Sequence, residues 1–347
     1  MITKVTVTEI AAAAGVSQAT VSAALHGRGR VGEACRLRIV ALSREMGYEP
    51  RVAAQLLRAK HTNQLGMVVA SQNSVIAFHQ EVQRLTMGYL VEQCDRLGMR
   101  YVMEFHHHEQ DQATSQFVPP NQITARLVDG TVLLGDVGDP LRQWLRERGN
   151  HPWVSIEEPA EFCVLSAADV GVKLAVEMLR GLGHRRVAYC GGAERYSQQR
   201  LGQRAFEAMA GEVMKTAVVQ LFGHEQNEAT VAGIHQWATH LLQDPTRPTA
   251  IICVTEYMAR AVIHAAIELG LQVPRDLSVI SYGSVLEAER RYPRLTTIEN
   301  DYADMTAQAM ELVLAQIQKQ PIEQPRRSVA PRLMPGRTVG PAPVGTA

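Results

Sequence analysis

A short cluster of small and amide-bearing side chains near the N-terminus has the chemistry to recognise base pairs. Gln18 carries an amide that can donate and accept hydrogen bonds, and it is followed by Ala19, Thr20, Ser22 and Ala23. Small side chains let a backbone approach DNA closely and contact thymine methyl groups. We therefore expect a helix here whose exposed face enters the DNA major groove.

Two further helices must hold that face in place, and the flanking sequence predicts both. Thr6 and Glu9 have the spacing of a capping box, which begins a helix that Gly15 ends. Ser17 is the expected cap of the second helix, and a third is expected over residues 33–46. Two helices joined by so tight a turn form a helix-turn-helix. The alternative is a generic three-helix bundle, and the small face of the second helix favours DNA binding.

The charge of the chain is divided unevenly between this head and the remainder. The formal net charge of the 347 residues is zero. Residues 1–62 contain nine lysines and arginines against four glutamates, so their net charge is +5 and that of residues 63–347 is −5. A basic segment on an acidic body is typical of a protein that binds nucleic acid through the basic part.

Composition excludes several other classes of protein. Hydrophobic residues make up 46% of the chain, which supplies a substantial core. No apolar run is long enough for a membrane span, and none follows Lys4 as in a secretory signal. The five cysteines form no C-x-x-C pair and indicate buried thiols in a reducing compartment. We expect a cytoplasmic protein.

The N-terminal motifs together resemble the DNA-binding domain of LacI/GalR-type regulators. The matching stretches are Val5–Ala11, Ala14–Ser17, Ala19–Ser22, Gly27–Val31 and Gly47–Pro50, in the family's order and spacing. The resemblance implies DNA contacts by Thr6, Ser17, Gln18, Ala19, Thr20, Ser22, Ala23, His26 and Arg30.

The resemblance implies that the residues that contact bases are Gln18, Ala19 and Ala23. Because two of these three are alanine, readout should depend more on methyl contacts and DNA shape than on hydrogen bonds. His26 replaces a usual asparagine, which favours a backbone contact there. Gly32 replaces the usual serine cap of the third helix, at a small loss of stability.

A short hinge is expected to follow Pro50. Residues 51–59 could form two turns of helix, which are marginal in isolation. The resemblance implies that this hinge folds on DNA, with Leu57 wedged into the minor groove, Ala54 on the same face and Arg51 available to a phosphate. The alternative is that Leu56 and Leu57 pack onto the body. We thus expect a DNA-binding domain over residues 1–50, a hinge over 51–63 and a third region over 64–347.

The third region alternates short β-branched runs with amphipathic stretches, which predicts an α/β fold with parallel sheets. The expected strands are 65–70, 100–105, 130–135, 153–156, 186–191, 217–222, 250–254 and 278–282. The expected helices are 81–97, 140–148, 171–182, 200–209, 228–241, 257–269 and 302–317. The alternation of strands and helices occurs twice along this region. We therefore expect two doubly wound subdomains, with a ligand site at the carboxyl ends of their strands. Residues 319–347 indicate a closing strand and a loose tail.

The resemblance extends over this region through the stretches 179–188, 277–282 and 293–298. It implies a two-lobed, periplasmic-binding-protein-like body that binds a small effector. The candidate effector contacts are Phe78, Arg200, Phe222, Glu256 and Ser284. Arg200 matches an arginine that clamps a hydroxyl or anionic group, although a surface salt bridge is the alternative. Phe222 could equally belong to the core.

Several polar positions of the family's effector site are altered here. Ala167 and Ala168 stand in place of Asp-Asn, and Thr255 and Glu256 in place of Asn-Asp. These losses argue against an ordinary sugar and favour an anionic or more apolar ligand. His106, His107 and His108 have the composition of a metal site, but adjacent histidines on a loop cannot easily face one ion, so no metal or cofactor is expected.

The sequence predicts a homodimeric, sequence-specific transcriptional regulator that acts as a repressor. It is expected to bind a near-palindromic operator and to respond to a small molecule. One alternative is a regulator with a degenerate effector site. A less favoured one is a ligand-binding or catalytic α/β protein whose head contacts other proteins. The nucleophile-elbow, phosphate-loop and zinc-protease motifs are missing from the chain, so we expect no enzyme.

Overall fold

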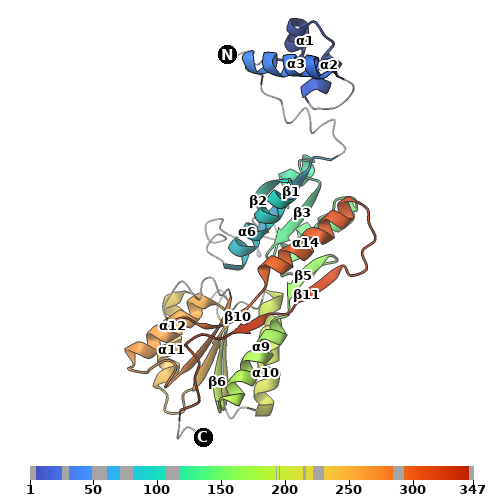
Figure 1. The fold of residues 1–347 in the computed structure, drawn as a ribbon. Helices are drawn as coiled ribbons and strands as arrows, with labels where there is room; N and C mark the ends of the chain where they lie inside the picture. The colour runs from blue at the N-terminus through green and yellow to red at the C-terminus, as the bar shows by residue number, and fades with distance from the viewer. Residues whose placement is uncertain are drawn as a thin grey trace. The chain divides into compact units, whose positions relative to one another are not determined.

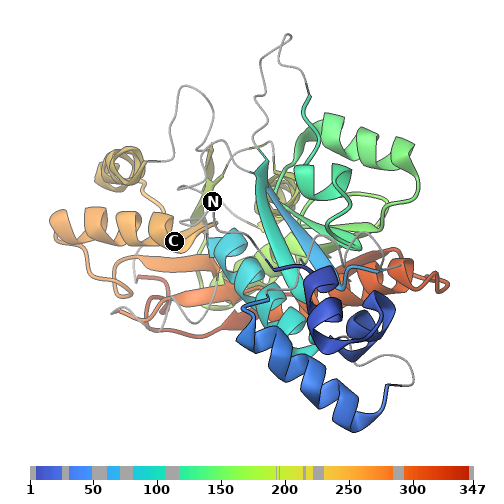
Figure 2. The ribbon, with the colours of Figure 1, turned by 90° about the horizontal axis from the view of Figure 1, so that it is seen from above.

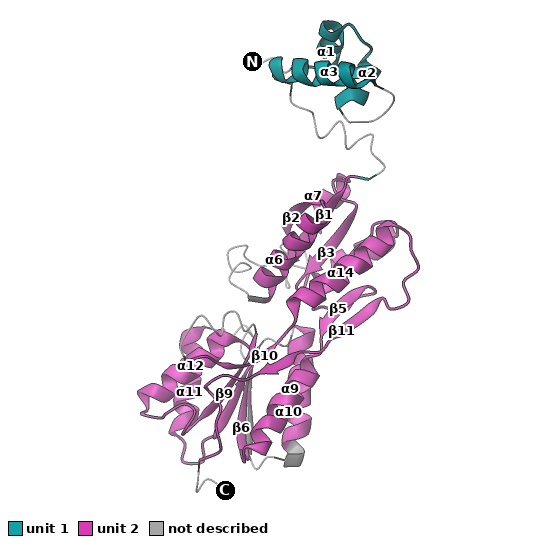
Figure 3. Ribbon diagram, viewed as in Figure 1, with its two compact units in different colours: residues 1–61 teal, residues 62–347 magenta. Residues whose placement is uncertain are grey.

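The computed structural model describes residues 5–25, 31–48, 61–70, 81–106, 117–192, 194, 196–213, 216–221, 230–283 and 293–343. The chain forms two compact units, Met1–His61 and Thr62–Ala347 (Figure 3). Of the expected DNA contacts, His26, Arg30, Arg51, Ala54 and Leu57 lie outside the described residues, as do the expected effector contacts Phe78, Phe222 and Ser284.

The first unit contains the three helices expected from the sequence. They are α1 (Val7–Ala14), α2 (Gln18–Leu25) and α3 (Glu33–Glu45). Each helix buries one apolar residue completely in a shared core, namely Ile10, Val21 and Ile39. The second unit consists of two lobes, each built on one six-stranded sheet with helices on both faces (Figure 1). This is the α/β class predicted from the alternation of strands and helices.

The sheet of the first lobe has the strand order β11-β5-β4-β3-β1-β2. Its described strand pairs are all parallel. The strands are β1 (Gln64–Ala70), β2 (Arg100–His106), β3 (Gly130–Leu134), β4 (Trp153–Ile156), β5 (Cys163–Ser166) and β11 (Arg326–Val329). Parallel pairing brings the carboxyl ends of β1, β3 and β4 to one edge of the sheet.

Helices cover both faces of this sheet (Figure 2). They are α6 (Glu81–Arg96), α7 (Asn121–Thr124), α8 (Gly138–Arg148) and α14 (Tyr302–Ile317). α6 and α14 pack against the face that carries Met67 and Val132. α7 and α8 pack against the opposite face, which carries Val68 and Leu133. Because both faces are covered, β1 and β3 are buried along their whole length.

The sheet of the second lobe has the order β12-β10-β9-β8-β6-β7. Its strands are β6 (Arg186–Gly191), β7 (Thr216–Leu221), β8 (Ala250–Cys253), β9 (Ser278–Gly283), β10 (Thr296–Glu299) and β12 (Arg332–Met334). β12 runs antiparallel to β10, and the other described pairs are parallel. The helices α9 (Ala168–Gly181), α10 (Ser197–Val213), α11 (Val231–Gln243) and α12 (Glu256–Glu268) pack on it as two pairs, α9 with α10 and α11 with α12.

The two lobes are joined by three crossings of the chain. The first leads from β5 into α9, the second from β10 into α14, and the third from β11 into β12. Both lobes therefore combine segments that are far apart in the sequence.

The sequence predicts a closing strand and a loose tail over residues 319–347. The structure confirms strand formation in this segment, but the part of the tail that it describes, up to residue 343, is not loose. This segment supplies β11 to the first lobe and β12 to the second. Thr338 is fully buried and donates its hydroxyl to Val279 O at 2.7 Å. The high proline content predicted the loose tail, whereas the pairing of these strands with β5 and β10 depends on distant segments that a local pattern cannot reveal. Within the described residues, no helix combines the length and apolarity needed to cross a bilayer.

Candidate DNA-binding and effector sites

The helix-turn-helix begins at a complete capping box. The Thr6 hydroxyl accepts a hydrogen bond from the N–H of Glu9 at 3.3 Å, and the Thr6 N–H donates to Glu9 Oε2 at 2.7 Å. At the other end of α1, Gly15 adopts φ +66°, a left-handed conformation that glycine reaches without strain. The chain thus leaves α1 by a tight turn and enters α2 three residues later.

The second helix is held by its own cap and by an apolar inner face. Ser17 Oγ accepts the N–H of Thr20 at 3.1 Å, and the two hydroxyl oxygens lie 2.8 Å apart. Val21 and Ala24 are buried against α1 and α3. Arg38 of α3 donates to Ala14 O at 3.0 Å, which satisfies a carbonyl at the end of α1.

The expected base-reading residues lie on the outer side of α2. Gln18 and Ala19 are exposed, while Thr20, Ser22 and Ala23 are half-buried. The Gln18 amide Nε2 donates to Thr8 Oγ1 at 3.1 Å, so in the absence of DNA its side chain is tied to α1. A hydrogen bond to a base edge would have to replace this contact.

The two described residues of the expected effector set have partners within their own lobe. Arg200, on the first turn of α10, is exposed and donates from Nη1 to the Glu194 carbonyl oxygen. Glu256 begins α12 and forms an ion pair with Arg260 one turn later, with both side chains largely buried. The geometry brings neither residue to the other, and their effector roles stay predictions.

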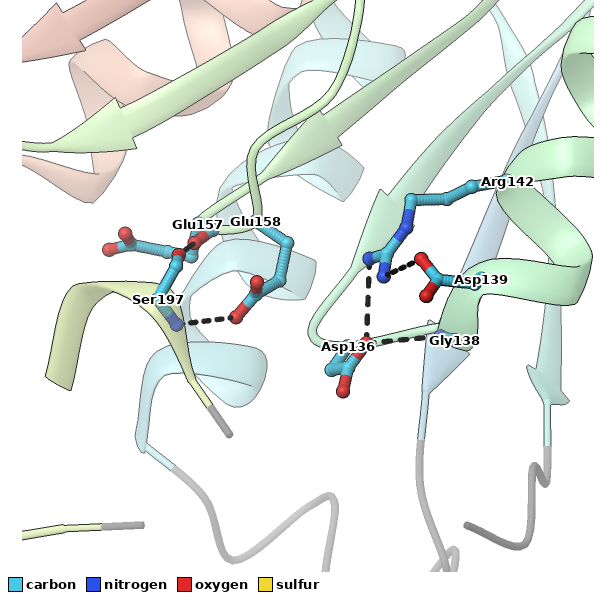
Figure 4. Close-up of polar contacts among 7 residues, drawn as sticks. All are labelled: Asp136, Gly138, Asp139, Arg142, Glu157, Glu158 and Ser197. Atoms are coloured by element: carbon cyan, nitrogen blue, oxygen red, sulfur yellow. Dashed lines mark hydrogen bonds and ion pairs between the residues drawn. The ribbon is translucent and has the colours of Figure 1, made fainter. Parts of the chain in front are cut away.

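A group of carboxylates that the sequence analysis did not single out lies where strands of the first lobe end (Figure 4). Asp136 follows β3, and Glu157 and Glu158 follow β4, the neighbouring strand. Ser197, the first residue of α10, belongs to the second lobe. Acidic residues directly after buried strands are the signal that could have identified this group, because ligands of such folds bind at the carboxyl ends of strands.

Glu157 and Glu158 connect the two lobes, the first through its backbone carbonyl and the second through its carboxylate. The backbone N–H of Ser197 donates to Glu158 Oε1 at 3.3 Å, and its hydroxyl donates to Glu157 O at 3.2 Å. The Glu157 carboxylate points away from that of Glu158 (Figure 4) and accepts from the N–H and hydroxyl of Ser166, at 3.2 and 2.9 Å. Glu157 also adopts φ +69°, which is uncommon for a residue with a Cβ.

Burial dominates the ionisation of both glutamates. It raises the pKa of Glu157 to about 7, although the two bonds from Ser166 act in the opposite direction. It also raises the pKa of Glu158 to about 7, with a further contribution from the negative charge of Asp136. Arg142 offsets part of that charge, since it lies 3.4 Å from Asp136 Oδ1.

The histidine-rich segment shows no metal site in the part of it that the structure describes. His106 is buried at the end of β2, and its ring lies 6.2 Å from that of Phe117 in an edge-on arrangement. His107 and His108 lie outside the described residues. Throughout the described ranges, no three histidine, cysteine or acidic side chains are grouped so as to hold a metal ion.

Comparison with known proteins gives two family matches and full-length relatives. Residues 6–51 match the model of bacterial regulatory proteins of the lacI family, and residues 176–339 match a periplasmic binding protein-like domain. The transcriptional repressor PurR of Serratia proteamaculans is 29% identical, over 97% of this chain and 98% of its own length. PurR of Shigella dysenteriae is 28% identical over the same shares.

Solved structures agree with the fold. The lac repressor dimer bound to operator and an anti-inducer superposes with a TM-score of 0.83 at 22% identity, over 97% of this chain and 99% of that one. A complex of the transcriptional regulator CelR with cellobiose superposes with a TM-score of 0.66 at 22% identity, over 96% of this chain and 100% of that one. The head, the two lobes and their connections therefore form a known architecture.

Proposed function

The chain belongs to the LacI family of bacterial regulatory proteins, and we propose that it is a ligand-responsive repressor that binds a near-palindromic operator as a homodimer. The observation that carries the proposal is the outer face of α2, where Gln18 and Ala19 are exposed on a helix fixed by α1 and α3. The full-length relatives named above are transcriptional repressors. We propose no catalytic activity.

We assign direct base reading to the exposed residues of α2. Gln18 would exchange its bond to Thr8 for a bond to a base edge, and Ala19 and Ala23 would contact thymine methyl groups. Thr6 and Ser17 cap the helices whose N-termini would face phosphates. Thr20 and Ser22 would line the same interface. On the sequence alone we add phosphate or groove contacts by His26, Arg30, Arg51, Ala54 and Leu57.

We place the effector where the strands of the two lobes end. A small molecule bound by both lobes would open or close the space between them. In a dimer this movement would change the spacing of the two DNA-binding heads. Arg200 and Glu256 are the described candidates for contacts from the second lobe. Their hydrogen bonds to Glu194 O and Arg260 would have to be exchanged for bonds to the ligand.

For the dimer we propose contacts through β2, which forms one edge of the first sheet. Tyr101 and Met103 lie two residues apart on one face of this strand and are 46% and 41% exposed. Leu97, just before the strand, is 50% exposed. An exposed apolar edge strand invites pairing or aggregation unless it is covered, and a second copy would cover it.

Selection of bound duplexes from a randomised double-stranded DNA library tests this function. The full chain should enrich one sequence with approximate two-fold symmetry, because each protomer of a dimer reads one half-site. The Gln18→Ala variant should relax the preference at one base pair of each half-site. Failure to enrich any sequence would contradict the proposal and favour a head that contacts other proteins.

A further inference from the structure

The first two residues of the second unit are bonded through their backbone to a single carboxylate. Asp129 Oδ1 accepts the N–H of Thr62 at 2.7 Å, and Asp129 Oδ2 accepts the N–H of Asn63 at 2.8 Å. Hydrogen bonds to an ionised acceptor are stronger than those between neutral groups. The two oxygens of one side chain therefore hold two adjacent peptide groups, directly before β1.

The carbonyl groups of the same two residues are bonded to the start of β2. Thr62 O accepts from Arg100 Nη2 at 3.3 Å, and Asn63 O accepts the N–H of Arg100 at 3.0 Å. The side-chain Nδ2 of Asn63 donates to Gly98 O at 2.9 Å. The backbone N–H and C=O groups of Thr62 and Asn63 thus all have partners in segments that are distant in the sequence.

Asn63 adopts an uncommon backbone conformation at this point. Its φ is +53°, in the left-handed region that residues with a Cβ seldom occupy. Asparagine enters this region more readily than most residues, but such a conformation persists only where the surrounding structure determines it. The bonds to Asp129, Arg100 and Gly98 supply that surrounding structure, so they fix the path by which the chain enters the first sheet.

These bonds lie at the amino edge of the first sheet, where the second unit begins. Asp129 directly precedes β3 and Arg100 begins β2, and both strands pair with β1. The first unit ends at His61, so Thr62 is the residue at which the head joins the body. Since β2 is also the strand for which we propose dimer contacts, this junction is bonded to the element that would pair two bodies.

We propose that Asp129 is a positioning residue for operator recognition: it holds Thr62 and Asn63, limits the reach of each head, and so sets the half-site spacing that a dimer accepts. This inference rests on the proposed repressor function and deepens it. Two released residues would add up to about 7 Å of chain to each head. One base pair displaces a half-site by only about 3.4 Å along the DNA, so this slack is large enough to admit another spacing.

The alternative is that Asp129 serves only the stability of the lobe, and the chain offers a matched control for it. Glu104 also uses both carboxylate oxygens to accept two adjacent backbone N–H groups, those of Asn121 and Gln122, at 2.8 and 3.0 Å. This is the same arrangement in the same lobe, but it holds the start of α7 and not the chain that comes from the head. A purely stabilising role would make the two carboxylates equivalent.

The affinity of the full chain for three duplexes tests the proposal. They are the operator selected from the randomised library and two copies of it with one base pair added or removed between the half-sites. The wild type should prefer the selected spacing by at least about tenfold. Asp129→Ala and Asp129→Asn should reduce the preference to about twofold, because asparagine would place a donor against one of the two N–H groups.

The preference for one spacing is a ratio of affinities, so a loss of folded protein cancels from it. Glu104→Gln, the counterpart of Asp129→Asn, should therefore keep the wild-type preference even where its Tm falls. Insertion of two glycines between His61 and Thr62 lengthens the chain outside the bonded residues. This insertion should reproduce the relaxed preference in a protein that retains Asp129.

Hydrogen exchange gives a readout that does not depend on DNA. The amides of Thr62 and Asn63 should be protected in the wild type and exchange faster in Asp129→Ala, while the amides within β1 keep their protection. Glu104→Gln should leave the exchange of both amides unchanged.

The inference would be overturned by an Asp129→Ala protein that keeps the full spacing preference, by a Glu104→Gln protein that loses it equally, or by unchanged exchange at Thr62 and Asn63. Failure of the proposed function is distinguishable from these outcomes. If the wild type selects no operator, the repressor function fails and the spacing role fails with it. If the wild type selects one spacing and Asp129→Ala preserves it, the function stands and only this role is lost.

Discussion

The backbone N–H of Ser197 lies 3.3 Å from Glu158 Oε1 and donates a hydrogen bond to it, although the two residues belong to different lobes. Ser197 is the first residue of α10, whose N-terminus carries partial positive charge. Glu158 follows a strand of the other sheet, beside Asp136. One of the contacts between the lobes is thus made by a buried carboxylate whose pKa is raised to about 7, so its charge depends on pH.

The neighbouring Glu157 predicts a pH-dependent stability. Its pKa is raised to about 7 from 4.5, so the unfolded chain ionises before the folded one as the pH rises. Stability is fully present below pH 4.5 and falls by about 3 kcal/mol as the pH rises through 7. Glu157→Gln removes this loss. Its Tm, relative to the wild type, should therefore be higher at pH 8 than at pH 5.

The control for this prediction is Glu161→Gln, in the same connection but exposed to solvent. Its Tm difference from the wild type should not change with pH. A Glu157→Gln difference that is equally constant would contradict the raised pKa of Glu157.

A matched pair of glycines in α9 tests the packing of the second lobe. A Cβ on Gly171 would lie 2.7 Å from Ile298 Cγ2 and 2.9 Å from Pro331 Cγ, whereas one on Gly181 would meet nothing within 4 Å. Gly171→Ala should therefore destabilise the protein by about 1–3 kcal/mol. Gly181→Ala, in the same helix, should be neutral or slightly stabilising. Chemical denaturation measures both, and equal effects would contradict the close approach of α9 to β10.

The capping box of α1 should contribute to both stability and DNA binding. Thr6→Ala removes the oxygen that accepts the Glu9 N–H and should cost the head about 1 kcal/mol. Thr6→Ser keeps the oxygen and should behave as the wild type. Circular dichroism of the full chain, with operator affinity measured in parallel, would detect the change. If Thr6→Ala had the same thermal stability and the same operator affinity as the wild type, this cap would contribute to neither.

The proposed dimer depends on the exposed edge of the first sheet. Met103→Glu places a charge on the apolar face of β2, so its burial in an interface would be strongly unfavourable. We expect a monomer in sedimentation experiments at a concentration where the wild type is dimeric. Val170→Glu, at a similarly exposed valine on α9, should stay dimeric. A dimeric Met103→Glu protein would exclude β2 as the interface.

The sequence was most informative where structure is determined locally. The Thr6–Glu9 capping box and the left-handed Gly15 are both visible in a few adjacent residues, and the structure confirms both. The long buried strands were also recognisable, because β1 and β3 are apolar throughout. Their order in the two sheets follows from contacts between distant segments, as the pairing of β11 with β5 illustrates.

The candidate site was harder to predict for the same reason. Asp136 and Glu158 are far apart in the sequence, and no short motif relates them. The pairing of β3 with β4 brings them to one edge of the sheet. Arg200, which a local motif did indicate, donates instead to the carbonyl oxygen of Glu194 within its own lobe. A motif identifies a residue type at a position, but its partners are determined by the tertiary structure.

The central claim is that the head binds one DNA sequence as a repressor does, and its affinity for the selected duplex tests this most directly. Fluorescence anisotropy should be measured with that duplex and with a scrambled one, at salt concentrations from about 50 to 200 mM. We predict that the selected duplex binds at least about a thousandfold more tightly, and that both affinities fall steeply with salt as phosphate contacts release counterions. Equal affinity for the two duplexes, or binding that salt does not change, would contradict the account.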